Sequence, residues 1–348
     1  MAAKKDAAFD HKALRAALKE GTVGNLYVFT GEEAYLREYY LGEMKKELVT
    51  NFEEFNYHRC EGKGLSVRTL AEMTETVPMM AERTLVVVTD FDPFQLNESE
   101  REQFMELVSD FPEYCTLILH CDLAEYNPNK TMKKLCKVME EQFTVVEFHT
   151  QDKNELLTWV RRRCKALGKE IGNQAAEHLL FTCGSLMTGL VPEISKICAY
   201  TKGDEVTVKD IDAVASPVIE ATVFRLTDAI SAGKFDVAAE ELAKLFQQQE
   251  EPIVVLSHIG REVRRLYTAR MAIDSGKDRA WLMELWNMRS DYPARLLMDA
   301  AKRVSTDWCR DSVQLVQKTD RRLKSERGID GEEELKLLLV RLAQGARQ

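Results

Sequence analysis

Apolar and polar residues alternate with two different periods along residues 1–150, so that short strand-like runs are separated by helix-like runs. The run T-L-V-V-V-T is β-branched and apolar on both faces, as expected for a buried strand of a parallel sheet. The candidate strands are Leu26–Thr30, Phe52–Cys60, Thr84–Thr89, Thr116–His120 and Thr144–His149. The candidate helices, with apolar residues three and four apart, are Lys12–Leu18, Glu32–Val49, Ser66–Thr76, Glu98–Ser109 and Thr131–Glu140. This alternation predicts a parallel sheet with helices on both faces.

The strand pattern fades after Thr150, and the rest of the chain has a helical period. A helix begins after Asp152, which suits an N-cap position and has Glu155 three residues later. The further candidate helices are Asn173–Phe181, Leu186–Tyr200, Val208–Val214, Ala221–Ser231, Asp236–Gln247, Pro252–Asp274, Asp291–Val304, Thr306–Lys324 and Glu332–Ala343. Ser216-Pro217 makes a natural break between them. The sequence thus predicts an α/β domain at 1–150, a small helical domain at 151–216 and an all-helical domain at 217–348.

Composition and charge narrow the possible functions. The 348 residues carry a formal net charge of −9, and 45% of them are hydrophobic, as in ordinary globular proteins. A protein whose main function is DNA binding usually has an excess of basic residues, so nucleic acid is not expected to be the only partner. No apolar run approaches the roughly 18 residues of a membrane helix, and the first ten residues lack the apolar core of a signal peptide. Eight scattered cysteines without a C-x-x-C pair are expected to be reduced and mostly buried, which favours the cytoplasm and no membrane.

The stretch N-L-Y-V-F-T-G-E-E-A-Y-L-R-E has the strand, glycine turn and helix order of a phosphate-binding loop. A functional loop reads G-x-x-x-x-G-K-[S/T], in which backbone N–H groups and a lysine hold the phosphates. Here no lysine follows Gly31, and Glu32 and Glu33 would lie at the helix N-terminus, where carboxylates are favourable. They place protein charge where an ATP phosphate would bind. We therefore expect no ATP binding and no cofactor.

Histidines and candidate nucleophiles define no catalytic or metal site. The six histidines are not spaced to share a metal, and neither H-E-x-x-H nor G-x-S-x-G occurs. His120 and Cys121 close a predicted strand, where an α/β enzyme can carry a catalytic residue. A structural role is the interpretation that we favour for both residues.

Two basic clusters lie on predicted helices. Arg161 and Arg162 belong to the run R-R-R-C-K, and Arg261, Arg264 and Arg265 share one helix face by their spacing. Each cluster is either a solvated helix face or a contact with another subunit or with DNA.

The segment T-V-P-M-M-A-E-R connects a helix to a buried strand. Met79 and Met80 are adjacent, and two adjacent side chains of a short turn cannot both face inward. Methionine pairs at exposed tips suit adaptable partner surfaces, whereas the alternative is that both belong to the core.

Several stretches together resemble the delta subunit of the bacterial DNA polymerase III clamp loader. They are L-Y-V-F-T-G-E-E-A-Y-L, V-P-M-M-A-E-R-T-L-V-V-V, E-L-L-T-W-V, G-S-L-M-T-G-L-V-P-E-I-S-K-I, V-F-R-L-T-D-A-I-S-A-G-K, E-E-P-I-V-V-L-S-H-I-G-R-E-V-R-R-L and K-T-D-R-R-L-K-S. Each is weak alone, but their order and spacing run through most of the chain. The resemblance implies an AAA+-like α/β domain with a degenerate nucleotide site, a helical lid domain and a helical collar domain that joins subunits together.

The family's role is mechanical, which implies a replication protein without catalysis of its own inside a DNA-directed DNA polymerase holoenzyme. The implied partners are the sliding clamp (beta subunit), the ATPase subunits (gamma/tau), delta-prime and primed DNA. The family's clamp contact is an apolar pair at a helix tip, commonly Leu-Phe, and matches Met79 and Met80 here. The alternatives are an active P-loop ATPase or a delta-prime-like stator. Delta-prime should carry a cysteine cluster for zinc and a Ser-Arg-Cys motif, whereas Arg163-Cys164 follows an arginine here.

Overall fold

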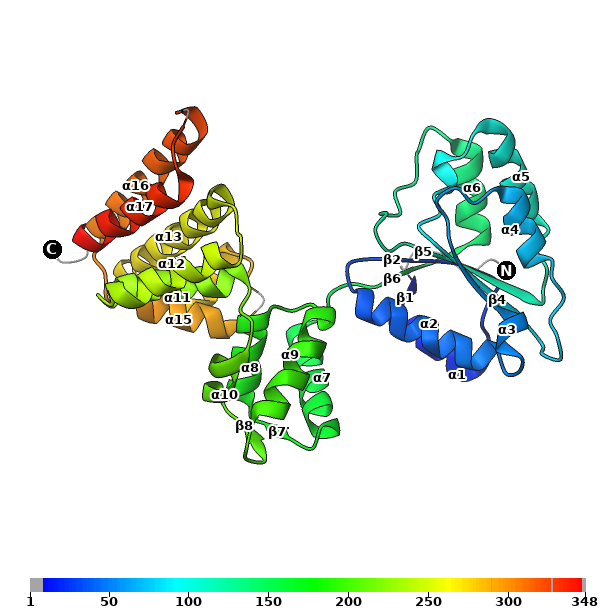
Figure 1. Cartoon of the computed structure of the whole chain (residues 1–348), viewed down its shortest axis with the longest axis horizontal. Helices are drawn as coiled ribbons and strands as arrows, with labels where there is room; N and C mark the ends of the chain where they lie inside the picture. The colour runs from blue at the N-terminus through cyan, green and yellow to red at the C-terminus, as the bar shows by residue number, and fades with distance from the viewer. Residues whose placement is uncertain (1–8, 289, 327, 346–348) are drawn as a thin grey trace. The chain divides into compact units, whose positions relative to one another are not determined.

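The computed structural model describes residues 9–288, 290–326 and 328–345, which fall into two compact units, 1–150 and 151–348. The first unit is built on a six-stranded sheet in the order β1-β6-β2-β5-β4-β3 (Figure 1). Every pair of neighbouring strands is parallel. The strands are β1 Phe9–Asp10, β2 Leu26–Thr30, β3 Tyr57–Glu61, β4 Thr84–Thr89, β5 Cys115–His120 and β6 Thr144–Glu147. The sheet confirms the α/β prediction for this part of the chain.

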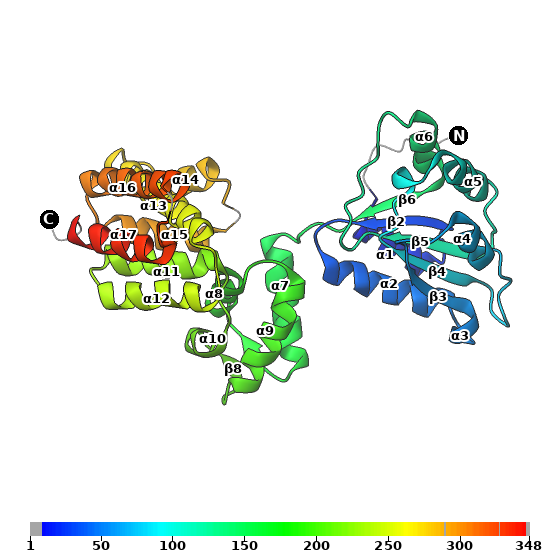
Figure 2. The same ribbon diagram turned by 45° about the horizontal axis from the view of Figure 1, so that its top comes forward.

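Helices cover both faces of this sheet, α1 and α2 on one side and α4, α5 and α6 on the other (Figures 1 and 2). Their bounds are α1 His11–Glu20, α2 Ala34–Leu48, α3 Glu53–Asn56, α4 Val67–Thr74, α5 Glu98–Ser109 and α6 Lys133–Gln142, with a 3₁₀ turn at Pro93–Gln95. The central strands β4 and β5 are buried at every position because both of their faces are covered.

The prediction of a strand over Phe52–Cys60 is wrong in its first half. Phe52 has a left-handed φ of 47°, and its carbonyl accepts the N–H groups of Phe55 and Asn56 at 2.9 and 3.1 Å. These bonds close the short helix α3, so that β3 begins only at Tyr57. The first half has phenylalanines three positions apart, at 52 and 55, which suits a helical turn, and only Phe55 and Tyr57 have the two-residue spacing of a strand. Such a short pattern does not distinguish a helical turn from a strand.

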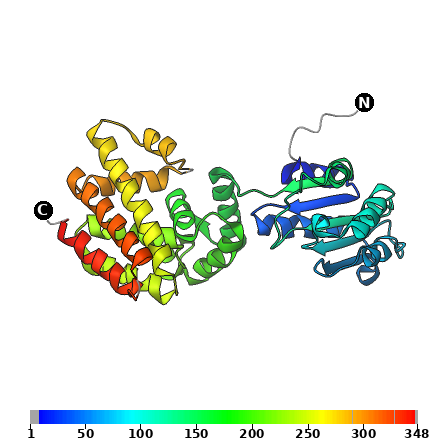
Figure 3. The ribbon, with the colours of Figure 1, turned by 90° about the horizontal axis from the view of Figure 1, so that it is seen from above.

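In the described part of the second unit the regular elements are helices (Figure 3), apart from a two-residue parallel pair of β7 Glu170–Ile171 with β8 Glu205–Val206. Its first helices are α7 Lys153–Ala166, α8 Asn173–Cys183, α9 Met187–Tyr200 and α10 Val208–Val214. The later ones are α11 Ile219–Ser231, α12 Phe235–Gln247, α13 Pro252–Asp274, α14 Arg279–Leu285, α15 Asp291–Ala301, α16 Thr306–Ser325 and α17 Gly331–Gly345. The predicted N-cap is confirmed, because the Asp152 carboxylate accepts the backbone N–H groups of Asn154 and Glu155. This arrangement confirms the predicted fold class of an α/β part followed by helices.

The helices α8 and α10 contact α11 and α15 through side-chain packing and hydrogen bonds within this unit. The ring of Phe181 lies edge-on to Phe224 with centroids 5.2 Å apart and lies 5.7 Å from Tyr292. The His178 ring bonds to the Tyr292 hydroxyl through Nδ1 and to the Asp212 carboxylate through Nε2, each at 2.8 Å. Residues 151–348 therefore pack as one unit, and a boundary at residue 216 stays a prediction. Among the described residues, no helix is both long and apolar enough to cross a membrane.

Candidate functional site

The loop that holds Met79 and Met80 lies between α4 and β4, before β4 begins. Connections that precede the strands of a parallel sheet lie at its amino edge, so this loop is at the edge opposite the β2–α2 turn. The methionine side chains are 44% and 75% exposed, whereas the strand that follows is buried. The alternative that both methionines belong to the core is therefore excluded. They form an apolar pair in an exposed loop.

Asn56, the last residue of α3, is hydrogen-bonded to the methionine segment. Its side chain is fully buried and pairs twice with the Met79 backbone, accepting from N at 2.7 Å and donating to O at 2.9 Å. The same amide also donates to the Asn51 carbonyl at 2.7 Å. Met80 has a φ of 48°, a left-handed conformation that a bulky residue rarely adopts unless its surroundings hold it there. The tip is therefore a fixed structure.

The glycine turn between β2 and α2 lies at the carboxyl edge of the sheet and is closed against the chain that follows β6. Gly31 has a φ of +110°, and a Cβ there would come within 2.5 Å of the Phe148 carbonyl oxygen. The Phe148 carbonyl accepts the Glu33 N–H at 3.0 Å, and its N–H donates to the Thr30 carbonyl at 2.8 Å. The Glu33 N–H is thus bound to protein, where a phosphate loop would leave such a donor for phosphate.

Two charged side chains are buried at this turn. Glu33 is the N-cap residue of α2 and is fully buried. Arg37 is 4% exposed; it donates to the Gly31 carbonyl and pairs with Asp122 at 3.1 Å. An open cavity of about 580 Å³ remains beside the turn. Its lining contains the carboxylates of Glu32, Asp122, Glu125 and Glu147 and the guanidinium of Arg37. A lining with more carboxylates than cations disfavours the phosphates of a nucleotide.

Asp90 follows β4, the place at which an ATPase carries its metal-binding carboxylate. Its carboxylate accepts the backbone N–H groups of Asp122, Leu123 and Ala124 at 2.7, 3.0 and 3.1 Å. Burial raises the pKa of Asp90, but these backbone hydrogen bonds outweigh it and the net pKa lies below its ordinary value. This carboxylate anchors the loop after β5, which leaves it badly placed to bind a metal.

His120 and Cys121, at the end of β5, have the structural surroundings that we expected. His120 is 1% exposed, and burial lowers its pKa, although the Glu38 carboxylate 3.5 Å away acts in the opposite direction. Burial also raises the pKa of Cys121 to about 11, which makes its thiol a poor nucleophile. The eight cysteines are free and mostly buried, as predicted. Within the described residues, no group of three His, Cys, Asp or Glu side chains could hold a metal ion.

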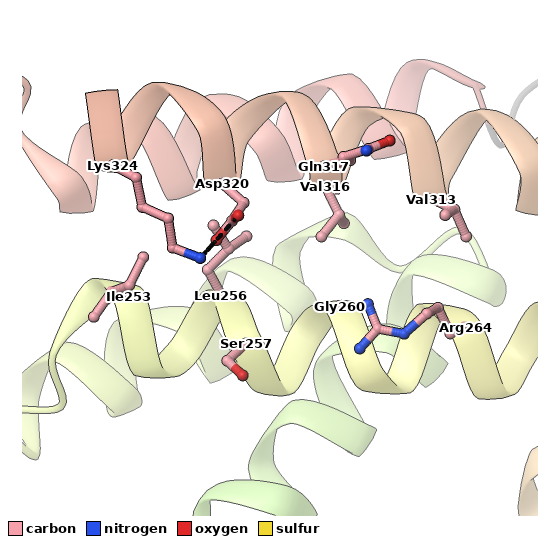
Figure 4. Close-up of a pocket in the computed structure, with 10 residues that line it drawn as sticks. All are labelled: Ile253, Leu256, Ser257, Gly260, Arg264, Val313, Val316, Gln317, Asp320 and Lys324. Carbon is pink, nitrogen blue, oxygen red and sulfur yellow. Dashed lines mark hydrogen bonds and ion pairs between the residues drawn. The ribbon is translucent and has the colours of Figure 1, made fainter. Parts of the chain in front are cut away.

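The predicted arginines fall into two groups. Arg161 donates to Asn173, Arg261 pairs with Glu220 at 3.3 Å, and Arg265 pairs with Glu262 at 3.5 Å. Arg162 and Arg264 are the exposed members. Arg264 lines a hollow of about 620 Å³ between α13 and α16, above Gly260 and beside Val316 (Figure 4). These two side chains are better placed than the other three for a contact outside the chain.

Taken together, these features define an α/β protein with a parallel sheet and a helical part after it, in which the glycine turn after β2 is bound by groups of the chain itself. Two family models match most of the chain. The model of the DNA polymerase III delta subunit matches residues 27–149, and the model of its C-terminal domain matches residues 220–342. The chain belongs to the delta-subunit family of the bacterial DNA polymerase III clamp loader.

Individual relatives support the assignment. DNA polymerase III subunit delta of Bacillus subtilis is 24% identical over 93% of each chain, and that of Escherichia coli is 23% identical over 53% of each. The solved structure of the Bacillus subtilis DNA clamp loader delta protein matches 95% of this chain and 98% of its own, with a TM-score of 0.50 and 22% identity. That structure is evidence for the shared fold.

Two residues of these sites could not be found in the sequence. Asn56 acts on Met79 across 23 positions, and Arg37 reaches Asp122 across 85 positions. Asn56 lay inside a mispredicted strand, and Arg37 lay in a helix whose apolar period gives no sign of a buried charge. The one available signal was an arginine at position 37, six residues after the glycine of a turn that has no lysine.

Proposed function

We propose that this subunit binds the ring-shaped sliding clamp through Met79 and Met80 and holds one clamp interface open. The ATPase subunits, together with delta-prime, would then place the clamp on primed DNA. The observation that carries the proposal is the pair of exposed methionines, 44% and 75% accessible, on a backbone fixed by the buried Asn56. Thioether side chains are adaptable and apolar, which suits insertion into a pocket on another protein.

We also infer that the subunit contributes no catalysis of its own to the holoenzyme. Gly31 is closed against Phe148, Arg37 fills the turn, and Asp90 is bound to three backbone N–H groups. Each of these contacts occupies a group that ATP hydrolysis would need. The subunit would act by binding, and the energy for the cycle would come from its ATPase partners. Arg162 and Arg264 are the residues that we would test first for contacts with DNA or a neighbouring subunit.

The test is the affinity of the full-length Met79→Ala, Met80→Ala double variant for the sliding clamp. Burying one methionine is worth about 1.5–3 kcal/mol, so the pair corresponds to roughly two to four powers of ten in affinity before ordering costs. We expect clamp binding to fall by at least a hundredfold while the melting temperature stays unchanged.

The matched control is the Glu75→Ala, Glu82→Ala double variant, which changes exposed charges on the same loop region. Rim charges contribute little to most interfaces, so its affinity should remain within a few-fold of the wild type. A folded methionine variant that still binds the clamp normally would place the contact elsewhere.

A further inference from the structure

A second exposed apolar pair lies beside the methionines. Phe52 and Phe55 are 44% and 49% exposed, and they belong to the segment that enters β3. Because β3 pairs with β4 in parallel, the segments that precede these strands lie side by side at the amino edge. Figures 1 and 2 show α3 and the α4–β4 loop at the same end of the first unit.

Hydrogen bonds fix the two segments against each other. Asn56 pairs with both backbone groups of Met79, and the Asn51 amide lies 3.5 Å from the Met80 carbonyl. Phe52 follows Asn51 and Phe55 precedes Asn56, so each aromatic residue lies one Cα step, about 3.8 Å, from an asparagine that contacts the methionine backbone. The four apolar side chains are thus carried on one hydrogen-bonded frame.

The backbone of this frame is strained on both sides. Phe52 and Met80 have φ values of 47° and 48°. Left-handed conformations at bulky residues are costly, and they concentrate where the chain must present a side chain in a particular place. Phe52 and Met80, one from each exposed apolar pair, have this conformation.

We propose that Phe52 and Phe55 join Met79 and Met80 in one apolar surface that contacts the sliding clamp, and that Asn56 positions the two halves. The inference rests on the proposed function above and names the aromatic part of that contact. An isolated exposed apolar side chain is ordinary, but four exposed apolar side chains on two adjoining, hydrogen-bonded segments are typical of a protein interface. Aromatic residues supply large contact area with few rotatable bonds, so they commonly anchor such interfaces.

The experiment measures clamp affinity of the full-length Phe52→Asn, Phe55→Ala double variant. Asparagine is chosen at position 52 because it tolerates positive φ and removes the aromatic ring. We expect affinity to fall at least tenfold with little change in melting temperature. Leu123→Ala is the matched control, because Leu123 is 91% exposed at the opposite edge of the same sheet. Its affinity should equal that of the wild type.

A second measurement does not depend on the stability of the variant. A photoreactive benzoyl-phenylalanine at position 55 should form a covalent product with the clamp on irradiation, and one at position 123 should not. The inference alone would be overturned if the methionine variant lost clamp binding, the phenylalanine variant bound the clamp fully and position 55 gave no crosslink. Normal binding by the methionine variant would overturn the proposed function, whatever the phenylalanine variants do.

Discussion

At the scale of single residues, the charged groups of the first unit serve the protein itself. Asp90, Arg37 and Glu33 occupy the positions that an ATPase uses for metal and phosphate, and each lies at the end of a central strand or the start of α2. Arg37 and Asp90 are hydrogen-bonded to backbone groups of the surrounding loops. We therefore expect that a lysine introduced into the turn would not by itself create nucleotide binding.

Asp90 gives a prediction for stability. Its folded pKa lies below the ordinary value, so the stabilisation that it supplies is present above about pH 4 and is lost as the pH falls through the folded pKa. Replacement by alanine removes the acceptor of three N–H groups and should cost about 1–3 kcal/mol at pH 7. Urea unfolding at pH 7, 5 and 3.5 measures the difference, which should persist at pH 5 and shrink at 3.5.

The variant Asp90→Asn is the control for charge, because asparagine also tolerates the φ of 55° and keeps one acceptor oxygen. It should lose less stability than alanine. An alanine variant as stable as the wild type at pH 7 would show that the loop after β5 does not depend on this carboxylate.

At the scale of elements, segments with a clear apolar pattern could be predicted, including the short helix Val208–Val214, whereas some short elements without one were missed. The bounds of α5 and α13, Glu98–Ser109 and Pro252–Asp274, agree with the sequence prediction because each presents several turns of apolar period. The strand β1 was missed because two residues held by backbone pairing with β6 leave no periodic signal. The helix α14 was missed although Asp278 caps it by accepting the Trp281 N–H.

The candidate site shows the same limit. Met79 and Met80 could be located from the resemblance, since the motif around them is local in sequence. Their support by Asn56 could not, because a hydrogen bond between segments that enter two neighbouring strands depends on the sheet order. The closure of Gly31 against Phe148 is likewise a contact between segments distant in sequence.

The β2–α2 turn gives the second prediction. The isolated chain should show no ATP binding at micromolar concentrations in calorimetry, and millimolar Mg-ATP should not raise its melting temperature, because a ligand raises stability only by binding the folded state. An ATPase subunit of the same assembly, titrated in parallel, serves as the positive control. Saturable micromolar binding would mean that the turn opens despite Arg37 and Phe148.

At the scale of the whole molecule, the two compact units would have separate tasks. The proposed clamp contact and the β2–α2 turn both belong to residues 1–150, which have their own sheet and their own apolar core. Residues 151–348 contain the second large core and the exposed Arg162 and Arg264. We therefore expect clamp binding and assembly with the other subunits to be separable.

A cut after residue 150 should separate them more cleanly than a cut near Pro217. Ending the chain near 217 would strip Phe224 and Tyr292 from Phe181 and break the His178–Tyr292 hydrogen bond, which exposes apolar surface on α8. The fragment 1–150 should instead fold cooperatively, bind the clamp with nearly full affinity and elute apart from the ATPase subunits on gel filtration. The fragment 151–348 should co-elute with those subunits and leave the clamp unbound. Co-elution of the folded fragment 1–150 with the ATPase subunits would assign assembly to the first unit, and the collar assignment for residues 217–348 would then be wrong.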